Sequence, residues 1–198
     1  MNIKYSVVGP VAGLDEAGAG PLCGDLFVAA VVLDPARPIS GLGDSKKLTE
    51  KRRLALFPQI QEQALSWAIV RVSVEEIDRI NIFQARMRGF ERAAAQLSGM
   101  ISAFLVDGNK VPPGMPDGFP VRAIVGGDAL EPAISAASIL AKVARDESME
   151  EASRLYPGYA FEKHKGYGTA LHLERLRTLG PTPLHRRSYK PVADLLKS

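Results

Sequence analysis

The stretch Gly13-Leu-Asp-Glu-Ala-Gly-Ala-Gly-Pro-Leu22 decides the fold, because it leads from an apolar strand through two adjacent acids into a glycine-rich turn. The run from Tyr5 to Leu14 has the length and composition of a strand. A turn over residues 17–24 follows, and Leu26 to Leu33 is a second apolar run. The sequence therefore opens with two strands, and it puts Asp15 and Glu16 at the end of the first one.

Helices and strands alternate after this opening. A helix is expected to start near Asp44 and Ser45, with a break or kink at Pro58, because proline lacks the amide donor that a helix interior needs. Residues 67–74 alternate like a strand. Ser73 and Glu76 then have capping-box spacing, which predicts the start of the clearest helix. Its apolar stripe at intervals of three or four residues comprises Ile77, Ile80, Phe83, Met87, Phe90, Ala94 and Leu97.

The second half of the chain predicts two short strands and one long helix. Residues 103–106 form one strand and residues 121–125 the next, and Pro132 suits the first turn of a helix. The buried side of that helix comprises Ile134, Ala137, Leu140, Ala141 and Ala144. This order predicts an α/β fold with a mixed sheet covered by helices. We expect residues 1–198 to form a single domain, in which residues from about 156 onward are a C-terminal helical extension packed on the core.

Four acids follow three predicted strands: Asp15 and Glu16, then Asp107, then Asp128. Each acid alone could be a turn former or a helix cap. If the strands are neighbours, however, the carboxylates converge and repel one another. A hard divalent cation such as Mg²⁺ or Mn²⁺ relieves that repulsion through oxygen ligands. The three histidines lack zinc-ligand spacing and are expected at the surface or in hydrogen bonds; they are His164, His172 and His185.

Composition and charge bear on the binding partner and on the cellular location. The net charge is +3, but seven Lys or Arg and one acid lie between Lys163 and Lys190, and a second basic cluster covers residues 46–53. Such clusters can be solvated faces or can hold a phosphate backbone. No apolar run is long enough to cross a membrane. The single cysteine, Cys23, is expected to pack in the core and suits a reducing, cytoplasmic location.

Acids that hold two cations ~3.5–4 Å apart can support phosphodiester hydrolysis. With the basic clusters, they predict a metal-dependent phosphodiesterase or nuclease. Two alternatives stay open at this point. One is another nuclease, such as a resolvase or a ribonuclease H restricted to hybrids. The other is a nucleic-acid-binding module whose acids are structural.

Several blocks, in order and spacing from about residue 12 to residue 191, resemble the signature blocks of bacterial ribonuclease HII. They are Gly13 to Leu22, Asp44-Ser-Lys-Lys-Leu48, Val106-Asp-Gly-Asn109, Ile134 to Val143 and His164-Lys-Gly-Tyr167. The resemblance implies a ribonuclease H-like fold with a C-terminal helical extension. It also implies cleavage of RNA in RNA–DNA hybrids and on the 5′ side of ribonucleotides embedded in duplex DNA, leaving 3′-hydroxyl and 5′-phosphate ends. The family's catalytic acids and metal ligands fall on Asp15, Glu16, Asp107 and Asp128.

The resemblance also implies substrate contacts. The turn Gly18-Ala19-Gly20 would sense the ribose 2′-hydroxyl with backbone groups, and Tyr167 would stack on the sugar beyond the ribonucleotide. Lys46 and Lys165 would contact phosphates. The partner is nucleic acid, and the chain is expected to act as a monomer because no apolar stripe is left over for an obligate oligomer.

Two positions depart from the family's pattern. Ala19 stands where the family usually has arginine, which removes a charge-assisted phosphate contact. Ala133 stands where the family commonly has glutamate, and the nearby Glu131 is a candidate substitute.

Overall fold

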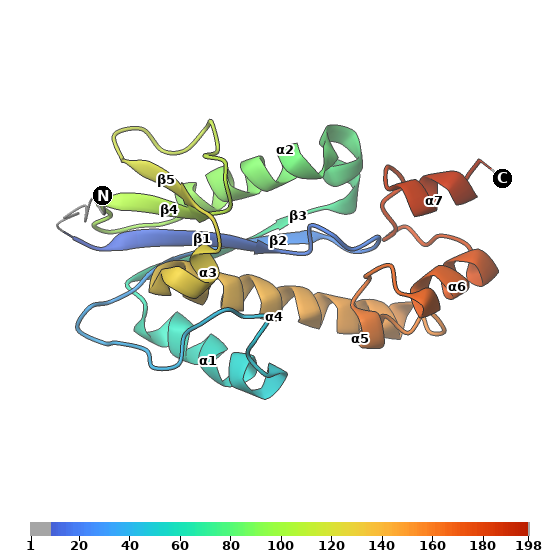
Figure 1. The fold of residues 1–198 in the computed structure, drawn as a ribbon, viewed down its shortest axis with the longest axis horizontal. Helices are drawn as coiled ribbons and strands as arrows, with labels where there is room; N and C mark the ends of the chain where they lie inside the picture. The colour runs from blue at the N-terminus through green and yellow to red at the C-terminus, as the bar shows by residue number, and fades with distance from the viewer. Residues whose placement is uncertain (1–8, 198) are drawn as a thin grey trace.

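The computed structural model describes residues 9–197, which form one mixed five-stranded sheet with helices on both faces (Figure 1). The strand order is β3-β2-β1-β4-β5. The first three strands pair antiparallel, whereas β1, β4 and β5 run parallel. The strands are β1 Val11–Ala17, β2 Leu26–Val32, β3 Ser66–Val72, β4 Ala103–Asp107 and β5 Val121–Ile124. The predicted mixed sheet is confirmed.

Helix α2 covers one face of the sheet, and α4 with α1 covers the other (Figure 1). The helices are α1 Glu50–Gln63, α2 Val74–Ala95, α3 Gly127–Leu130, α4 Pro132–Leu155, α5 Phe161–His164, α6 Ala170–Leu179 and α7 Lys190–Leu195. The last three lie beyond one end of the sheet, next to the turn that joins β1 to β2. The C-terminal helical extension is therefore confirmed.

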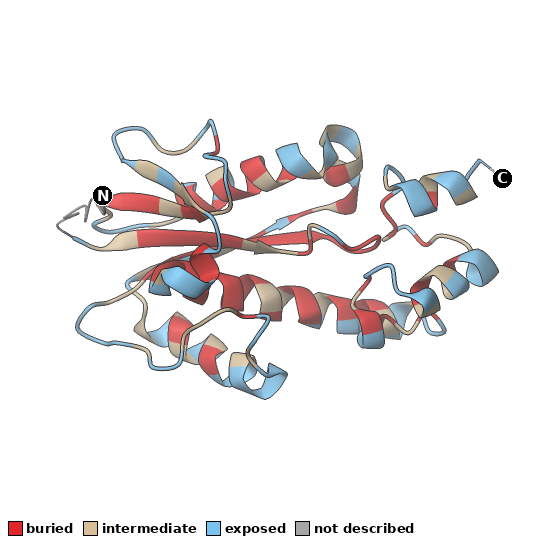
Figure 2. Cartoon of the chain, in the orientation of Figure 1, coloured by how far each residue is buried: buried red, intermediate tan, exposed pale blue. Residues whose placement is uncertain are grey.

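The interior strand β2, between β3 and β1, is buried along its whole length, as the apolar run predicts (Figure 2). Val28 and its even-numbered neighbours pack toward α2, and Val31 packs toward α4. Helix α4 also presses closely on β1. A Cβ built on Gly13 would lie 2.1 Å from the carbonyl carbon of Ala133. The absence of a side chain at Gly13 therefore lets the first turn of α4 rest directly on the strand that carries the first acids.

The first strand differs from its predicted bounds. Its predicted start at Tyr5 lies outside the described residues, and it continues past Leu14 to Ala17. Asp15 and Glu16 therefore lie inside β1, where they pair with Ala29 and Val28 of β2.

The predicted start of the helix near Asp44 and Ser45 is wrong. Those residues form turns, and α1 begins at Glu50 with Thr49 as its N-cap. The predicted break at Pro58 is also wrong, because α1 continues to Gln63. Pro58 is exposed, so water can solvate the carbonyl that the missing N–H leaves free.

The capping residue of α2 is confirmed, since the Ser73 hydroxyl accepts a hydrogen bond from the Glu76 amide at 3.3 Å. The reciprocal half of the capping box is not formed. Instead, the Glu76 carboxylate binds Arg92, sixteen residues further on. This contact is possible because α2 is kinked at Asn81, where φ is 66°. The kink also breaks the predicted apolar stripe, and Phe83 is 44% exposed.

The histidines anchor the C-terminal extension. All three are buried and make hydrogen bonds, so of the two expected placements, at the surface or in hydrogen bonds, the second is the one found. The rings of His164 and His172 stack with centroids 4.4 Å apart, and His172 Nε2 lies 3.1 Å from His185 Nε2. His185 forms a β-bridge with Cys23, which is fully buried as expected. The extension thus packs on the β1–β2 turn through a buried cluster.

Candidate active site

Asp15 projects from β1 toward α4 and is 5% exposed. Its Oδ1 accepts a hydrogen bond from the Glu16 amide at 2.7 Å. Burial raises the pKa of Asp15 well above its ordinary value, and the charges of Glu16 and Asp107 raise it further; the Glu16 amide and Ser138 oppose the shift. The site therefore holds a carboxylate that is costly to ionise without a nearby cation.

Glu16 projects to the opposite face, because successive side chains of a strand alternate. There it meets Arg86 of α2, with Nε 2.9 Å from Oε1 and one terminal nitrogen 3.1 Å from Oε2. Burial raises the pKa of Glu16, and the Arg86 charge partly offsets this rise. Sequence reasoning missed Arg86, because it lies on a helix whose pattern signalled only core packing.

Asp107 and Asp128 lie on the neighbouring elements. Asp107 ends β4, one residue beyond Val106, which pairs with Leu14 of β1. Its Oδ1 accepts a hydrogen bond from the Gly127 amide at 2.8 Å. Asp128 is buried in the first turn of α3. Burial and the charges of Asp44 and Asp107 raise its pKa. The parallel pairing of β1 with β4 thus brings the acids together near the carboxyl ends of these two strands.

The four acids are a crowded set of oxygen donors without a ready-made cage. Within residues 9–197, no three His, Cys, Asp or Glu side chains form a group that could hold a metal ion as they stand. Asp15, Glu16 and Asp128 nevertheless have raised pKa values, caused partly by neighbouring carboxylates. This mutual repulsion and the purely oxygen donor set fit a hard divalent cation.

Lys46 is exposed and electrostatically linked to these acids. Burial alone would lower its pKa, but the charges of Asp128 and Asp15 produce a net rise. The charge of Asp44 also raises the pKa of Asp128. Asp44 belongs to the block Asp44 to Leu48 but was not predicted as a site residue. Two other basic residues of this cluster have structural partners: Arg53 donates to the carbonyls of Ser45 and Leu48, and Arg52 donates to that of Ser40.

The predicted turn and tyrosine lie side by side. A Cβ on Gly20 would lie 3.7 Å from Cε1 of Tyr167, whose side chain is 46% exposed. Gly18 is buried with φ +100°, and a Cβ there would lie 2.3 Å from Nε of Arg145. The fold itself therefore requires glycine at position 18, whereas nothing around Gly20 excludes a side chain.

Lys165 and the two positions that differ from the family's pattern, 19 and 133, all lie in ordered parts of the fold. Lys165 Nζ binds Glu150 Oε1 at 2.9 Å, so its charge already has a partner. Ala19 is half-buried in the turn, and Ala133 is buried against Gly13. Glu131 is the N-cap of α4, and its carboxylate makes no hydrogen bond or ion pair with any residue from 9 to 197.

Two buried arginines belong to the same region, and sequence reasoning did not single them out. Arg145 and Arg186 are 1% and 0% exposed. Arg145 donates to the carbonyls of Cys23 and Lys165, and Arg186 donates to carbonyls of the β1–β2 turn, including that of Gly18. Arg186 lies within the basic run of residues 163–190, which suggested phosphate contacts, but its burial excludes such a contact.

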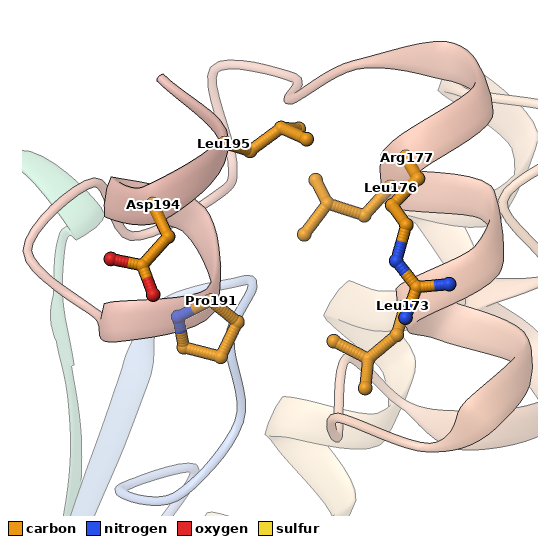
Figure 3. A pocket seen from close by; sticks show the side chains of 6 residues that line it. All are labelled: Leu173, Leu176, Arg177, Pro191, Asp194 and Leu195. Atoms are coloured by element: carbon orange, nitrogen blue, oxygen red, sulfur yellow. The ribbon is translucent and has the colours of Figure 1, made fainter. Parts of the chain in front are cut away.

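A separate hollow of about 410 Å³ lies between α6 and α7 (Figure 3). Leu173 and Leu176 of α6 face Pro191 and Leu195 of α7 across it. None of its lining residues is a predicted site residue. Among residues 9–197, no helix is long and apolar enough to cross a bilayer.

Solved structures share this architecture. Ribonuclease H2 from Pyrococcus horikoshii OT3 superposes with a TM-score of 0.81 at 27% identity, covering 96% of this chain and 98% of that one. Bst-RNase HIII, solved in complex with Mn²⁺, has a TM-score of 0.78 at 18% identity, covering 95% of this chain and 69% of that one, and this likeness concerns the fold alone. The fold and the acids on β1, β4 and α3 thus define a protein of the ribonuclease H-like class.

Comparison with related sequences identifies the family within this class. The profile of the Ribonuclease HII family matches residues 12–192. A Ribonuclease HII from Marinomonas sp. (strain MWYL1) is 56% identical over 187 residues, which are 94% of this chain and 93% of the relative. The chain belongs to the Ribonuclease HII family, and it is a ribonuclease H: a hydrolase that cuts nucleic acid internally. The family is metal-dependent.

Proposed function

We propose that the chain cleaves the RNA strand of RNA–DNA hybrids and cuts 5′ of ribonucleotides embedded in duplex DNA. Hydrolysis with Mg²⁺ or Mn²⁺ leaves 3′-hydroxyl and 5′-phosphate ends and serves the removal of ribonucleotides and primers. One observation carries this proposal. The acids on β1, β4 and α3 lie close enough to raise one another's pKa values, and β1 leads directly into a glycine turn in which Gly20 lies beside the exposed Tyr167.

The metal ligands in this proposal are Asp15, Glu16, Asp107 and Asp128. Divalent cations bound by these residues would supply charge neutralisation at the phosphate and activation of water. Asp15 is fixed by the Glu16 amide and Asp107 by the Gly127 amide, so both carboxylates are oriented before substrate arrives. Lys46 adds a positive charge beside the acids and contacts a phosphate of the bound strand.

Substrate selection falls to the turn and the tyrosine. The backbone of Gly18, Ala19 and Gly20 approaches the ribose closely enough to meet its 2′-hydroxyl. The exposed ring of Tyr167, beside Gly20, stacks on the next sugar. Lys165 contacts a phosphate only after leaving Glu150, so its share is smaller than that of Lys46.

We further propose that residues 1–198 act as a single catalytic domain, monomeric, in the cytoplasm, with nucleic acid as the partner and no membrane. A reducing location is supported by the cysteine count, because the single cysteine, Cys23, has no second cysteine in the chain with which to form a disulfide.

Three duplexes test the proposal: all-DNA, DNA with one ribonucleotide, and an RNA–DNA hybrid, each with Mg²⁺, Mn²⁺ or a chelator. We expect cutting of the last two only, and only with metal. The ends are identified by ligation and by phosphatase sensitivity. Cutting of all-DNA duplex, or of the hybrid alone, would favour another nuclease of this class; binding with no cutting would favour a binding module.

A further inference from the structure

Arg186 is a fully buried side chain in the loop between α6 and α7, and every one of its donors has a partner. Its partners are the carbonyls of three residues in the turn and the hydroxyl of Tyr189. The contacts are Nε to Gly24 O at 3.0 Å, one terminal nitrogen to Gly18 O at 2.6 Å and Gly24 O at 2.7 Å, and the other to Ala19 O at 3.0 Å and Tyr189 Oη at 2.8 Å.

These bonds fix two consecutive peptide planes. A trans peptide is planar, so its N–H points opposite to its C=O. The carbonyls of Gly18 and Ala19 both point inward to Arg186. The amides of Ala19 and Gly20, which complete the same two planes, must therefore point away from Arg186. No hydrogen bond within residues 9–197 uses either amide as a donor.

Tyr189 reinforces the arrangement. Its hydroxyl donates to the carbonyl of Ala19 at 2.7 Å while it accepts from Arg186. The guanidinium carbon lies 5.1 Å from the centroid of the tyrosine ring, so cation–π attraction also holds the pair together. Ala19 is thus held by two donors from the C-terminal extension.

We propose that Arg186 is a positioning residue that presents the Ala19 and Gly20 amides to the ribose 2′-hydroxyl, with Tyr189 as its support. This inference rests on the proposed function, and it adds a residue outside the turn on which ribose selection depends. Two donors held in one direction lose little entropy when they bind an oxygen. The arrangement uses backbone only, so it is independent of the side chain at position 19.

Lysine cannot reproduce this geometry. Its ammonium is a single point with three donors, whereas the planar guanidinium reaches three carbonyls and a hydroxyl at once. Arg186→Lys keeps the charge and loses the fixed planes. Tyr189→Phe is a milder change, since it removes only one donor to Ala19. The exposed Arg154, at the end of α4, gives Arg154→Lys as the matched control for an arginine-to-lysine change away from the turn.

The test compares two duplexes that differ only by one 2′-hydroxyl. Dissociation constants are measured with chelator present, and kcat/KM is measured with Mg²⁺. For Arg186→Lys we expect kcat/KM on the single-ribonucleotide duplex to fall about 10- to 100-fold. The preference in Kd for that duplex over all-DNA should fall toward one, while Kd for all-DNA stays unchanged. Tyr189→Phe should move both quantities in the same direction by less, and Arg154→Lys should move neither.

The outcomes separate the inference from the function on which it rests. Thermal melting checks that each variant folds, and if Arg186→Lys does not, Tyr189→Phe decides alone. Equal weakening on both duplexes, or an unchanged preference in folded variants, overturns the role of Arg186. If the wild-type protein itself neither cuts nor prefers the ribonucleotide duplex, the proposed function fails and the inference fails with it.

Discussion

Arg86 on α2 and Glu16 on β1 form a two-point ion pair between the helix and the sheet face that it covers, with N–O distances of 2.9 and 3.1 Å. The same guanidinium lies 5.9 Å from the ring centroid of Phe90, which fixes its place on the helix. The pair matters because Glu16 is a proposed metal ligand whose burial disfavours its charge.

Replacing Arg86 should therefore change the pH at which the cleavage rate falls on the acidic side of the pH profile. Arg86→Gln removes the cation that lowers the pKa of Glu16, so that pKa rises and Glu16 is protonated at higher pH. We expect the fall in cleavage rate on acidification to begin at higher pH than in the wild-type protein. Rates from pH 5 to 9 at saturating Mg²⁺ measure this. Arg92→Gln, which breaks a pair with Glu76 on the same helix, is the control, and identical pH profiles in both variants would contradict the prediction.

Asp15→Asn should stabilise the metal-free protein while abolishing cleavage. The folded state raises the pKa of Asp15, so at neutral pH its ionised form opposes folding, and this cost disappears only as pH falls. A neutral isostere removes that cost, on the order of 1 kcal/mol. Urea unfolding in chelator measures the gain. Cleavage should fall at least about 100-fold while duplex binding persists. A variant that cuts normally would refute the assignment of Asp15.

Ala19→Arg should strengthen substrate binding. It restores a charged side chain to the turn while the backbone stays held by Arg186 and Tyr189. A charge-assisted contact contributes roughly 1.5–3 kcal/mol, which corresponds to about 10- to 100-fold in kcat/KM on a duplex with one ribonucleotide. Ala19→Gln, similar in length but uncharged, is the matched control. No gain over glutamine would sink the idea.

Tyr167 should act through its ring. Tyr167→Phe keeps the aromatic surface beside Gly20 and should retain most activity, whereas Tyr167→Ala should lose about 10-fold in kcat/KM. Equal losses in both variants would point to the hydroxyl instead of stacking.

The buried histidines should make the fold sensitive to acid. Burial first, and then the charge of His172, lowers the pKa of His185 to about 4. The unfolded chain protonates this ring near pH 6.5, so its contribution to stability is present above pH 6.5 and is lost as pH falls to about 4. The loss is on the order of 3 kcal/mol. Urea titrations across this range should show a shallower decline in His185→Gln than in the wild-type protein; parallel declines would contradict the assignment.

Sequence patterns predicted the sheet well, because strands follow from local alternation and from short apolar runs. β2 is an uninterrupted apolar run of strand length, and it is a buried strand. Asp107 was found from the strand before it. Local patterns failed where the outcome depends on backbone conformation or exposure and not on residue spacing. The kink at Asn81 exposes Phe83. Pro58 is exposed, and α1 continues through it.

The partners of the site were beyond sequence reasoning for the same reason. Arg86 meets Glu16 across 70 positions of the chain, and no local pattern joins them. Arg186 was hidden in a basic run, where an internal brace and a phosphate contact look alike. Only burial distinguishes the two.

The turn that carries Gly18 and Ala19 is held from 168 and 167 positions away by Arg186. Closing so long a loop is entropically costly and slow compared with forming local contacts. The proposed metal ligands on β1, β4 and α3 all precede Arg186 along the chain. A polypeptide that ended before residue 186 would therefore contain those acids but lack the side chain proposed to orient the turn that senses the ribose.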